Sequence, residues 1–154
     1  MFDFTGKVVV ISGASSGLGA QMARGFAKQG ATLVITARRF EKLQALADEF
    51  KTMGVECLPL KCDVTDSAMV DDVAKQVEEK FGRVDVLVNC AGSAKNAGVL
   101  DMTNDEWDFT IATDMSSVFY VTRAFANIMK KNNYGRIINI ASMYGLVGNT
   151  AMDT

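Results

Sequence analysis

Three glycines in the spacing G-x-x-x-G-x-G, at positions 13, 17 and 19, offer the clearest chemistry in the sequence. They follow the apolar run 8–11, which is typical of a strand covered on both faces. Glycine lets a ligand approach the backbone closely, and a helix starting here would direct free N–H groups and its positive dipole end at a phosphate. The pattern favours a dinucleotide site over a plain strand-to-helix turn. The residues expected to form this site are Gly13, Ser15, Ser16, Gly17, Leu18 and Gly19.

Two adjacent arginines, Arg38 and Arg39, follow the second apolar segment, 32–37. A cofactor with a free ribose 2′-hydroxyl usually meets an Asp or Glu at this place, and the sequence has neither there. Guanidinium groups make planar, bidentate hydrogen bonds to phosphate, so the pair favours NADP(H), with NAD(H) as the alternative. The competing interpretation is a pair of solvated arginines at a helix start, where the helix dipole would disfavour them.

Alternating strands and helices must position these residues. The expected strands cover 7–12, 32–37, 56–61, 84–89 and 136–141, and the expected helices cover 17–29, 40–53, 66–81 and 105–131. This alternation predicts right-handed βαβ units and a parallel sheet. Pro59 cannot donate to a strand ladder, so the third strand belongs at an edge. The prediction is an α/β fold: a Rossmann-like, doubly wound sheet in the order 3-2-1-4-5, with its ligand near the carboxyl ends of strands 1 and 4.

Two expected helices carry further detail. Asp66 can cap the helix 66–81. The helix 105–131 is the longest, and its apolar residues are Ile111, Met115, Phe119, Phe125 and Met129.

Length and composition exclude several classes of function. A chain of 154 residues, 49% hydrophobic, is expected to form one domain over 1–154 with a core of its own. The net charge of −2 and the lack of a basic block argue against a nucleic-acid partner. No apolar run approaches the roughly 20 residues of a membrane span, and the first residues lack the basic start of a signal peptide.

Cysteine and histidine content narrow the chemistry further. The three cysteines, Cys57, Cys62 and Cys90, form no C-x-x-C pair, which favours reduced, buried thiols and a cytoplasmic location. The sequence has no histidine, which excludes Ser-His-Asp catalysis and histidine metal sites, and we expect no metal. Acid/base work must fall to Tyr, Lys or carboxylates.

The segment 12–19 resembles the cofactor loop of the short-chain dehydrogenase/reductase family, with Ser12 keeping the hydroxyl of the family's usual Thr. The resemblance implies that Asp63 accepts a hydrogen bond from the adenine amino group and that its neighbour Val64 lines the adenine pocket. Asp63 could instead be an ordinary residue at the entry to the helix 66–81.

The segment Asn89-Cys90-Ala91-Gly92 resembles the family's Asn-Asn-Ala-Gly. The resemblance implies that Asn89, Ala91 and Gly92 belong to the cofactor site, where the two small residues let the cofactor ribose pass close to the backbone. Cys90 replaces an Asn that is thought to brace the central sheet. A thiol hydrogen-bonds only weakly, so this bracing should be lost or replaced.

Two residues correspond to the family's catalytic positions. Asp114 stands where the family has an Asn that holds a water in the proton path to a catalytic Lys; its alternative is an ordinary helix acid. Ser142 ends an apolar strand and corresponds to the serine that donates a hydrogen bond to the substrate oxygen, stabilising developing charge. The competing interpretation of Ser142 is a simple turn residue.

The family's Tyr-x-x-x-Lys motif does not occur between Ser142 and the last residue, Thr154. The resemblance therefore implies that the chain covers the first part of the family's domain, without its last strands and helices. For the intact protein it implies an NADP-dependent, homo-oligomeric oxidoreductase, a dimer or tetramer. The enzyme would transfer a hydride between nicotinamide and a carbonyl or secondary alcohol, of the keto-sugar acid (gluconate 5-dehydrogenase) or 3-oxoacyl carrier-protein type. The alternatives are a catalytically incomplete dinucleotide-binding module and an interaction fragment that pairs through its fifth strand.

Overall fold

A computed structural model describes residues 2–93, 98 and 100–147. Five parallel strands form one sheet in the order β3-β2-β1-β4-β5, as predicted. Pro59 lies in the edge strand β3. The strands are β1 (Val8–Ser12), β2 (Thr32–Ala37), β3 (Cys57–Lys61), β4 (Val86–Asn89) and β5 (Arg136–Asn139).

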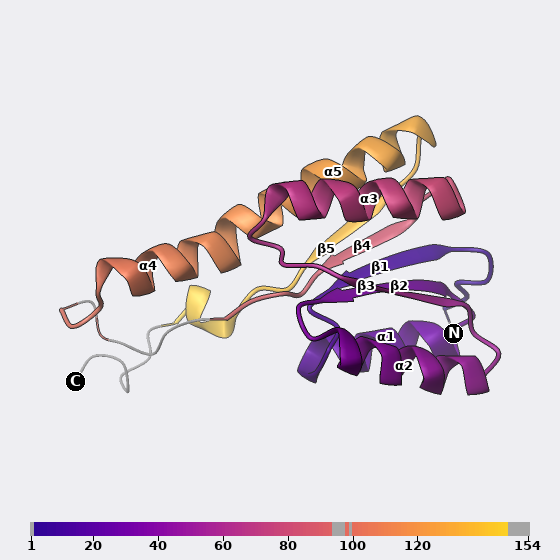
Figure 1. The fold of residues 1–154 in the computed structure, drawn as a ribbon, viewed down its shortest axis with the longest axis horizontal. Helices are drawn as coiled ribbons and strands as arrows, with labels where there is room; N and C mark the ends of the chain where they lie inside the picture. The colour runs from indigo at the N-terminus through magenta and orange to yellow at the C-terminus, as the bar shows by residue number, and fades with distance from the viewer. Residues whose placement is uncertain (1, 94–97, 99, 148–154) are drawn as a thin grey trace.

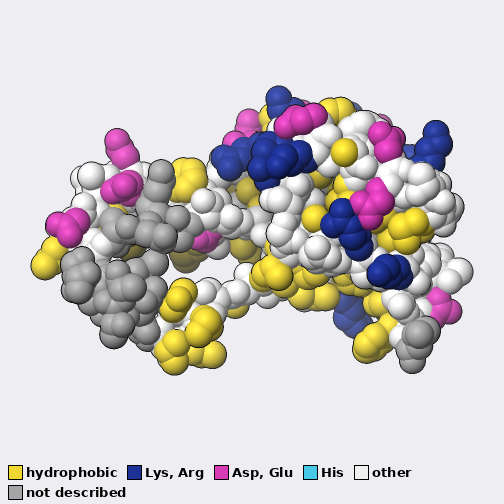
Figure 2. Space-filling model, turned by 90° about the horizontal axis from the view of Figure 1, so that it is seen from below, with side chains coloured by type: hydrophobic (Ala, Val, Ile, Leu, Met, Phe, Trp, Pro, Cys, Tyr) yellow, Lys and Arg dark blue, Asp and Glu magenta, His cyan; other side chains and the backbone are white. Residues whose placement is uncertain are grey.

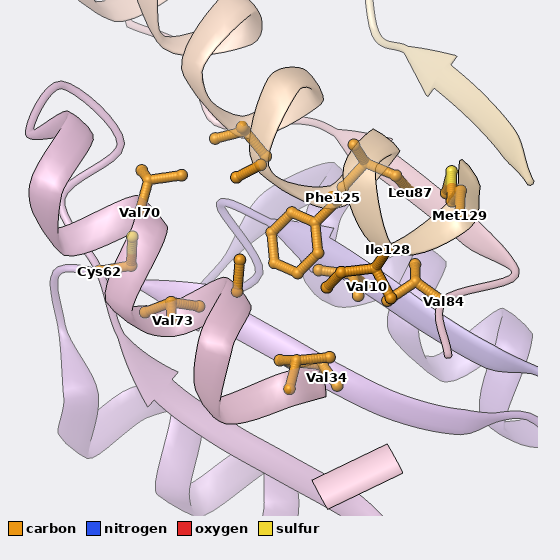
Figure 3. Close-up of a cluster of buried hydrophobic side chains, with 14 of the residues drawn as sticks. Val10, Val34, Cys62, Val70, Val73, Val84, Leu87, Phe125, Ile128 and Met129 are labelled. Carbon is orange, nitrogen blue, oxygen red and sulfur yellow. The ribbon is translucent and has the colours of Figure 1, made fainter. Parts of the chain in front are cut away.

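The helices cover both faces of the sheet, with α1 and α2 on one side and α3 and α5 on the other (Figure 1). Each face has its own core because alternate strand residues point in opposite directions. Val10 and Leu87 pack with Phe125 beneath α3 and α5 (Figure 3), whereas Val9 and Val88 pack on the α1–α2 side. The helices are α1 (Gly17–Lys28), α2 (Phe40–Thr52), α3 (Ser67–Phe81), α4 (Asn104–Ile111) and α5 (Ser117–Lys131).

The capping residues explain where two helices begin. The Asp66 side chain accepts hydrogen bonds from the N–H groups of Ala68 and Met69, which confirms it as the cap of α3. Thr103 and Glu106 form a reciprocal capping box at the start of α4.

The predicted long helix is interrupted by a π-helical turn, η1 (Ala112–Ser116), between α4 and α5. The apolar residues assigned to this helix do not share one environment. Phe125 and Met129 are buried, but Met115 and Phe119 are exposed. The reason is positional: Phe119 lies two residues from the buried Val121, on the opposite side of α5. The helix therefore carries apolar residues on both of its sides.

Asp85 connects three strands, β1, β4 and β5, at the end of the sheet where these strands begin. Its backbone N–H donates to the Val8 carbonyl, its carbonyl accepts from Arg136 N–H, and its carboxylate accepts from Val8 N–H, each at 2.9 Å. Only 1% of its side chain is exposed. Burial raises the pKa of Asp85, but hydrogen bonds from Arg83 and Val8 and the charges of Arg83 and Lys7 outweigh burial, so the pKa lies below its ordinary value.

The strand β5 forms the second edge of the sheet, and all four of its residues are exposed. Ile137 and Ile138 are each 41% exposed, and Ile140 beyond the strand is 38% exposed. Apolar residues on both faces are typical of a strand inside a sheet, so this edge leaves uncovered the surface that such a strand normally buries.

Candidate functional site

A cavity of about 380 Å³ lies where all five strands end. Its lining includes the first or second residue after each strand, as expected for a doubly wound sheet: Gly13, Arg38, Cys62, Cys90 and Ile140. The predicted binding residues that line this cavity are Gly13, Ser15, Ser16, Leu18, Gly19, Arg38, Arg39, Asp63, Val64, Ala91 and Gly92.

Two glycines of the loop are required by the packing of the backbone itself. Gly13 has φ +72°, and a Cβ on it would lie 2.7 Å from the Cα of Ala91. A Cβ on Gly19 would lie 2.5 Å from the Gly13 carbonyl oxygen. The glycine loop thus crosses the segment after β4 at a distance that no side chain allows.

The start of α1 keeps its backbone donors available. Ser16 occupies the N-cap position, yet its side chain makes no capping hydrogen bond. The hydroxyls of Ser15 and Ser16 instead accept hydrogen bonds from Arg39 Nη2, at 2.9 and 2.7 Å. Arg38 lines the same cavity, and within the described residues its side chain makes no recorded hydrogen bond or ion pair. The site therefore combines a guanidinium that contacts two serine hydroxyls with a first helical turn that has no side-chain cap, and both features suit a phosphate.

Ser12, buried at the end of β1, fixes the geometry of the loop after β4. Its hydroxyl donates to the Val88 carbonyl at 3.4 Å and accepts from the N–H groups of Cys90 and Ala91, at 3.1 and 3.2 Å. These bonds join the ends of β1 and β4.

Asn89, predicted as a cofactor-binding residue, does not line the cavity. Its side-chain amide donates to Asn139 at 2.8 Å and to Thr122 at 2.9 Å, so it braces β4 against β5 and α5. The strand alternation explains this placement, because Asn89 shares a face with Leu87, which packs under α3 and α5. Gly17 is likewise not among the residues that line the cavity.

Asp63 lines the cavity and also shapes the turn into α3. Its Oδ1 accepts hydrogen bonds from the N–H and the hydroxyl of Thr65, at 3.0 and 2.8 Å. The two interpretations of Asp63 from the sequence are thus compatible: it stabilises the helix entry while its carboxylate lies at the cavity wall.

The two predicted catalytic residues make their hydrogen bonds to different partners. Asp114 belongs to the π-helical turn, and its Oδ1 accepts the Ser93 N–H at 2.8 Å. Ser142 is exposed, accepts the Tyr144 N–H at 3.2 Å and does not line the cavity. In the described part of the chain, no hydrogen bond links Asp114 to Ser142.

Several cavity residues were missed by sequence reasoning. Thr113 is the most informative: it is 7% exposed, and its hydroxyl is one of two buried side-chain oxygens without a hydrogen-bond partner in the described structure. Its position beside Asp114 was the available signal. The other missed lining residues are Ala37, Cys62, Thr65, Cys90, Ser93 and Ile140.

The cysteine thiols near the cavity are poor nucleophiles. Burial raises the pKa of Cys62 to about 11, with the charges of Asp63 and Asp66 adding to the effect, and burial also raises the pKa of Cys90. The third thiol, Cys57, has a pKa raised by burial to about 12. Among the residues that the structure describes, no group of three or more Cys, Asp or Glu side chains could hold a metal ion.

Comparison with known proteins identifies the family. The short chain dehydrogenase family model matches residues 7–154, so the chain belongs to this family. A (2S)-[(R)-hydroxy(phenyl)methyl]succinyl-CoA dehydrogenase subunit of Thauera aromatica is 39% identical over 92% of this chain and 57% of its own length. A 3-oxoacyl-[acyl-carrier-protein] reductase of Escherichia coli is 37% identical over 96% of this chain and 59% of its own length. The chain therefore spans somewhat more than half of these relatives.

Solved structures agree with the fold. A metagenomic short-chain oxidoreductase in complex with NADP has a TM-score of 0.87 and 39% identity, over 92% of this chain and 65% of its own. An actinorhodin polyketide ketoreductase with NADPH has a TM-score of 0.90 and 32% identity, over 95% of this chain and 57% of its own. Within the described residues, no helix has the length and apolar character to cross a membrane.

Proposed function

We propose that this chain forms the cofactor-binding part of an NADP-dependent oxidoreductase. The observation that carries the proposal is the contact of Arg39 with the hydroxyls of Ser15 and Ser16 at the cavity where the strands end. A guanidinium and two hydroxyls can together donate to several oxygens of a 2′-phosphate. The NADP and NADPH complexes of two similar proteins support this choice of cofactor.

The residues present fit such a cofactor. The glycine loop and the uncapped start of α1 would hold the pyrophosphate, while Arg38, Arg39, Ser15 and Ser16 would hold the 2′-phosphate. Asp63 would accept from the adenine amino group, with Val64 beside the adenine. Ala91 and Gly92 would let the ribose approach the backbone, and the partnerless hydroxyl of Thr113 is available to a bound polar group. When bound, the cofactor supplies the hydride chemistry at its nicotinamide.

For the intact enzyme, the proposed reaction transfers a hydride to or from a carbonyl or secondary alcohol. Ser142 would donate a hydrogen bond to the substrate oxygen, and Asp114 would hold a water in the proton path. The 3-oxoacyl type is favoured over keto-sugar acids, because the names of similar proteins include a 3-oxoacyl-[acyl-carrier-protein] reductase and a (2S)-[(R)-hydroxy(phenyl)methyl]succinyl-CoA dehydrogenase subunit. The proposal includes a homo-oligomeric state and, from the three free cysteines, a cytoplasmic location.

A second candidate is a dinucleotide-binding fragment without catalysis. The absence of Tyr-x-x-x-Lys from the 154 residues and the exposed edge at β5 favour this candidate for the chain taken alone. Both candidates predict dinucleotide binding at the same cavity, but only the oxidoreductase predicts turnover of a substrate.

Cofactor preference is the decisive measurement. We expect the intact protein to bind NADPH more tightly than NADH, because a charge-assisted phosphate contact contributes more than a neutral hydrogen bond. Arg39→Ala should weaken NADPH binding by about tenfold and NADH binding much less. Replacing Ala37 by Asp together with Arg38 by Ser should reverse the ranking. Isothermal titration of both dinucleotides tests this, and equal affinities or an NADH preference in the unaltered chain would refute it.

A further inference from the structure

A second cleft lies between α1 and α2, directly beside the main cavity. It encloses about 250 Å³, and its polar lining consists of Ser15, Arg24, Lys42 and Glu49. We call it the α1–α2 cleft. Ser15, whose hydroxyl Arg39 contacts, lines both the cleft and the main cavity, so the two spaces adjoin at this residue.

The charges of the α1–α2 cleft do not cancel. Arg24 makes a bidentate pair with Glu49, with both N···O distances 2.7 Å. The hydrogen bond from Arg24 lowers the pKa of Glu49, and that from Glu49 raises the pKa of Arg24, so both groups stay charged and offset each other. Lys42 is exposed, and no hydrogen bond or ion pair of its ammonium group is recorded in the part of the chain that the structure describes. The cleft therefore has a net positive charge carried by Lys42.

Lys42 and Arg39 both lie at the start of α2. Arg39 is the N-cap residue of this helix, and Lys42 belongs to its first turn, three residues further on. Arg39 donates a hydrogen bond to Ser15 Oγ at 2.9 Å, and Lys42 lines the α1–α2 cleft that Ser15 also lines. Figure 2 views the molecule from the α1–α2 side and shows basic side chains on this surface, together with acidic ones.

We infer that Lys42 is a specificity-determining residue whose ammonium attracts the 2′-phosphate of a dinucleotide held at Arg39, Ser15 and Ser16. This inference rests on the proposed function. NADH lacks the 2′-phosphate, so Lys42 changes the ratio of the two affinities rather than dinucleotide binding in general. Because Lys42 is exposed, solvent screens its charge, and its contribution is about two- to fivefold at low salt.

A charge-reversal pair tests the inference on the intact protein. Lys42→Glu should weaken NADPH binding by about three- to tenfold, and NADH binding should change by less than about twofold. Lys51→Glu makes the same charge change on the same helix, about 13 Å away along its axis, and should leave the affinity ratio unaltered. The difference between the two variants should shrink as salt rises toward about 1 M.

A variant that makes the α1–α2 cleft more positive should increase the affinity for NADPH. Glu49→Gln removes the charge that offsets Arg24 and should strengthen NADPH binding by about twofold at low salt. If the unaltered chain prefers NADPH but Lys42→Glu and Lys51→Glu behave alike, the role of Lys42 is refuted while the proposed function stands. If the unaltered chain shows no NADPH preference, both are refuted. Circular dichroism establishes that each variant is folded, and Lys42→Gln provides a milder change with the same expected direction.

Discussion

The Asp114 carboxylate accepts the Ser93 N–H and so holds the backbone that follows β4. This contact requires an acceptor oxygen but not a charge, and the side-chain oxygen of Asn could replace it. A Cβ on Gly92 would lie 3.1 Å from Asp114 Oδ1, which shows how closely the turn and the loop approach. At position 114, therefore, the placement of an acceptor oxygen constrains the residue type more than the charge of the side chain does.

We predict that Asp114→Asn leaves the NADPH affinity of the intact protein within about twofold, because the Ser93 N–H keeps its partner. Asp114→Ala should weaken NADPH binding by about five- to tenfold, because the loop loses this hydrogen bond. Asp108→Ala, in the neighbouring helix α4, serves as the control. Fluorescence titration with NADPH measures all three, and equal effects of the Asn and Ala replacements would contradict the positioning role.

At the scale of elements, three strands depend on one buried carboxylate. Asp85 connects β1, β4 and β5, and its pKa is lowered in the folded protein. A lowered folded-state pKa means that the unfolded chain binds the proton more tightly. The contribution of Asp85 to stability is thus fully present above the unfolded-state value of about 4, and it is lost as the pH falls from there through the folded-state pKa.

We predict that Asp85→Asn lowers the free energy of unfolding by about 1–3 kcal/mol at pH 7. The difference between the variant and the unaltered chain should narrow as the pH is lowered below about 4, because protonation removes the same charge. Asp72→Asn, on the exposed surface of α3, makes the same change in net charge and should show no such pattern. Urea unfolding at several pH values is the measurement, and a difference independent of pH would contradict the linkage.

The sequence predicted the elements because their signals are local and repeated. The alternation of strands with helices, together with Pro59, was sufficient to predict the sheet order, and Asp66 to predict the start of α3. The π-helical turn was not predicted, since the segments on its two sides each have an ordinary helical pattern and the extra residue shifts only the phase between them. The direction of Asn89 was also missed, although its shared face with Leu87 indicated it. The hydrogen bonds from Arg39 to Ser15 and Ser16 join residues that are 24 and 23 positions apart in the sequence. They depend on side-chain rotamers, which no local sequence pattern specifies.

At the scale of the whole molecule, the described structure has a cavity where the strands end and an uncovered edge at β5. β5 exposes Ile137 and Ile138, and the sequence contains no Tyr-x-x-x-Lys. In the family, the Tyr of this motif protonates the substrate oxygen, and the Lys lowers the pKa of that Tyr. General acid/base catalysis contributes roughly 10²–10⁴-fold to rate, so binding and turnover should separate in this chain.

We predict that the 154-residue chain, expressed alone, binds NADPH weakly, turns over no substrate, and self-associates or aggregates through β5. NADPH oxidation with a 3-oxoacyl substrate and light scattering measure the two properties. A chain extended through the next segment of its reading frame is the comparison. Oxidation by the short chain at a rate near that of the extended one would contradict this account. Tyr144, 54% exposed and bonded through its N–H to Ser142, would then be the first candidate for the acid.

The segment 90–93 is held from two directions, by the Ser12 hydroxyl at Cys90 and Ala91 and by Asp114 at Ser93. Fixing one residue's backbone costs about 1–2 kcal/mol of conformational entropy. In this segment folding has already met that cost, so a ligand that lies against it has little left to order. We therefore expect affinity at this wall of the cavity to depend on Ser12 and Asp114, which do not line it, and loosening any of the three hydrogen bonds would appear as an entropic loss on binding.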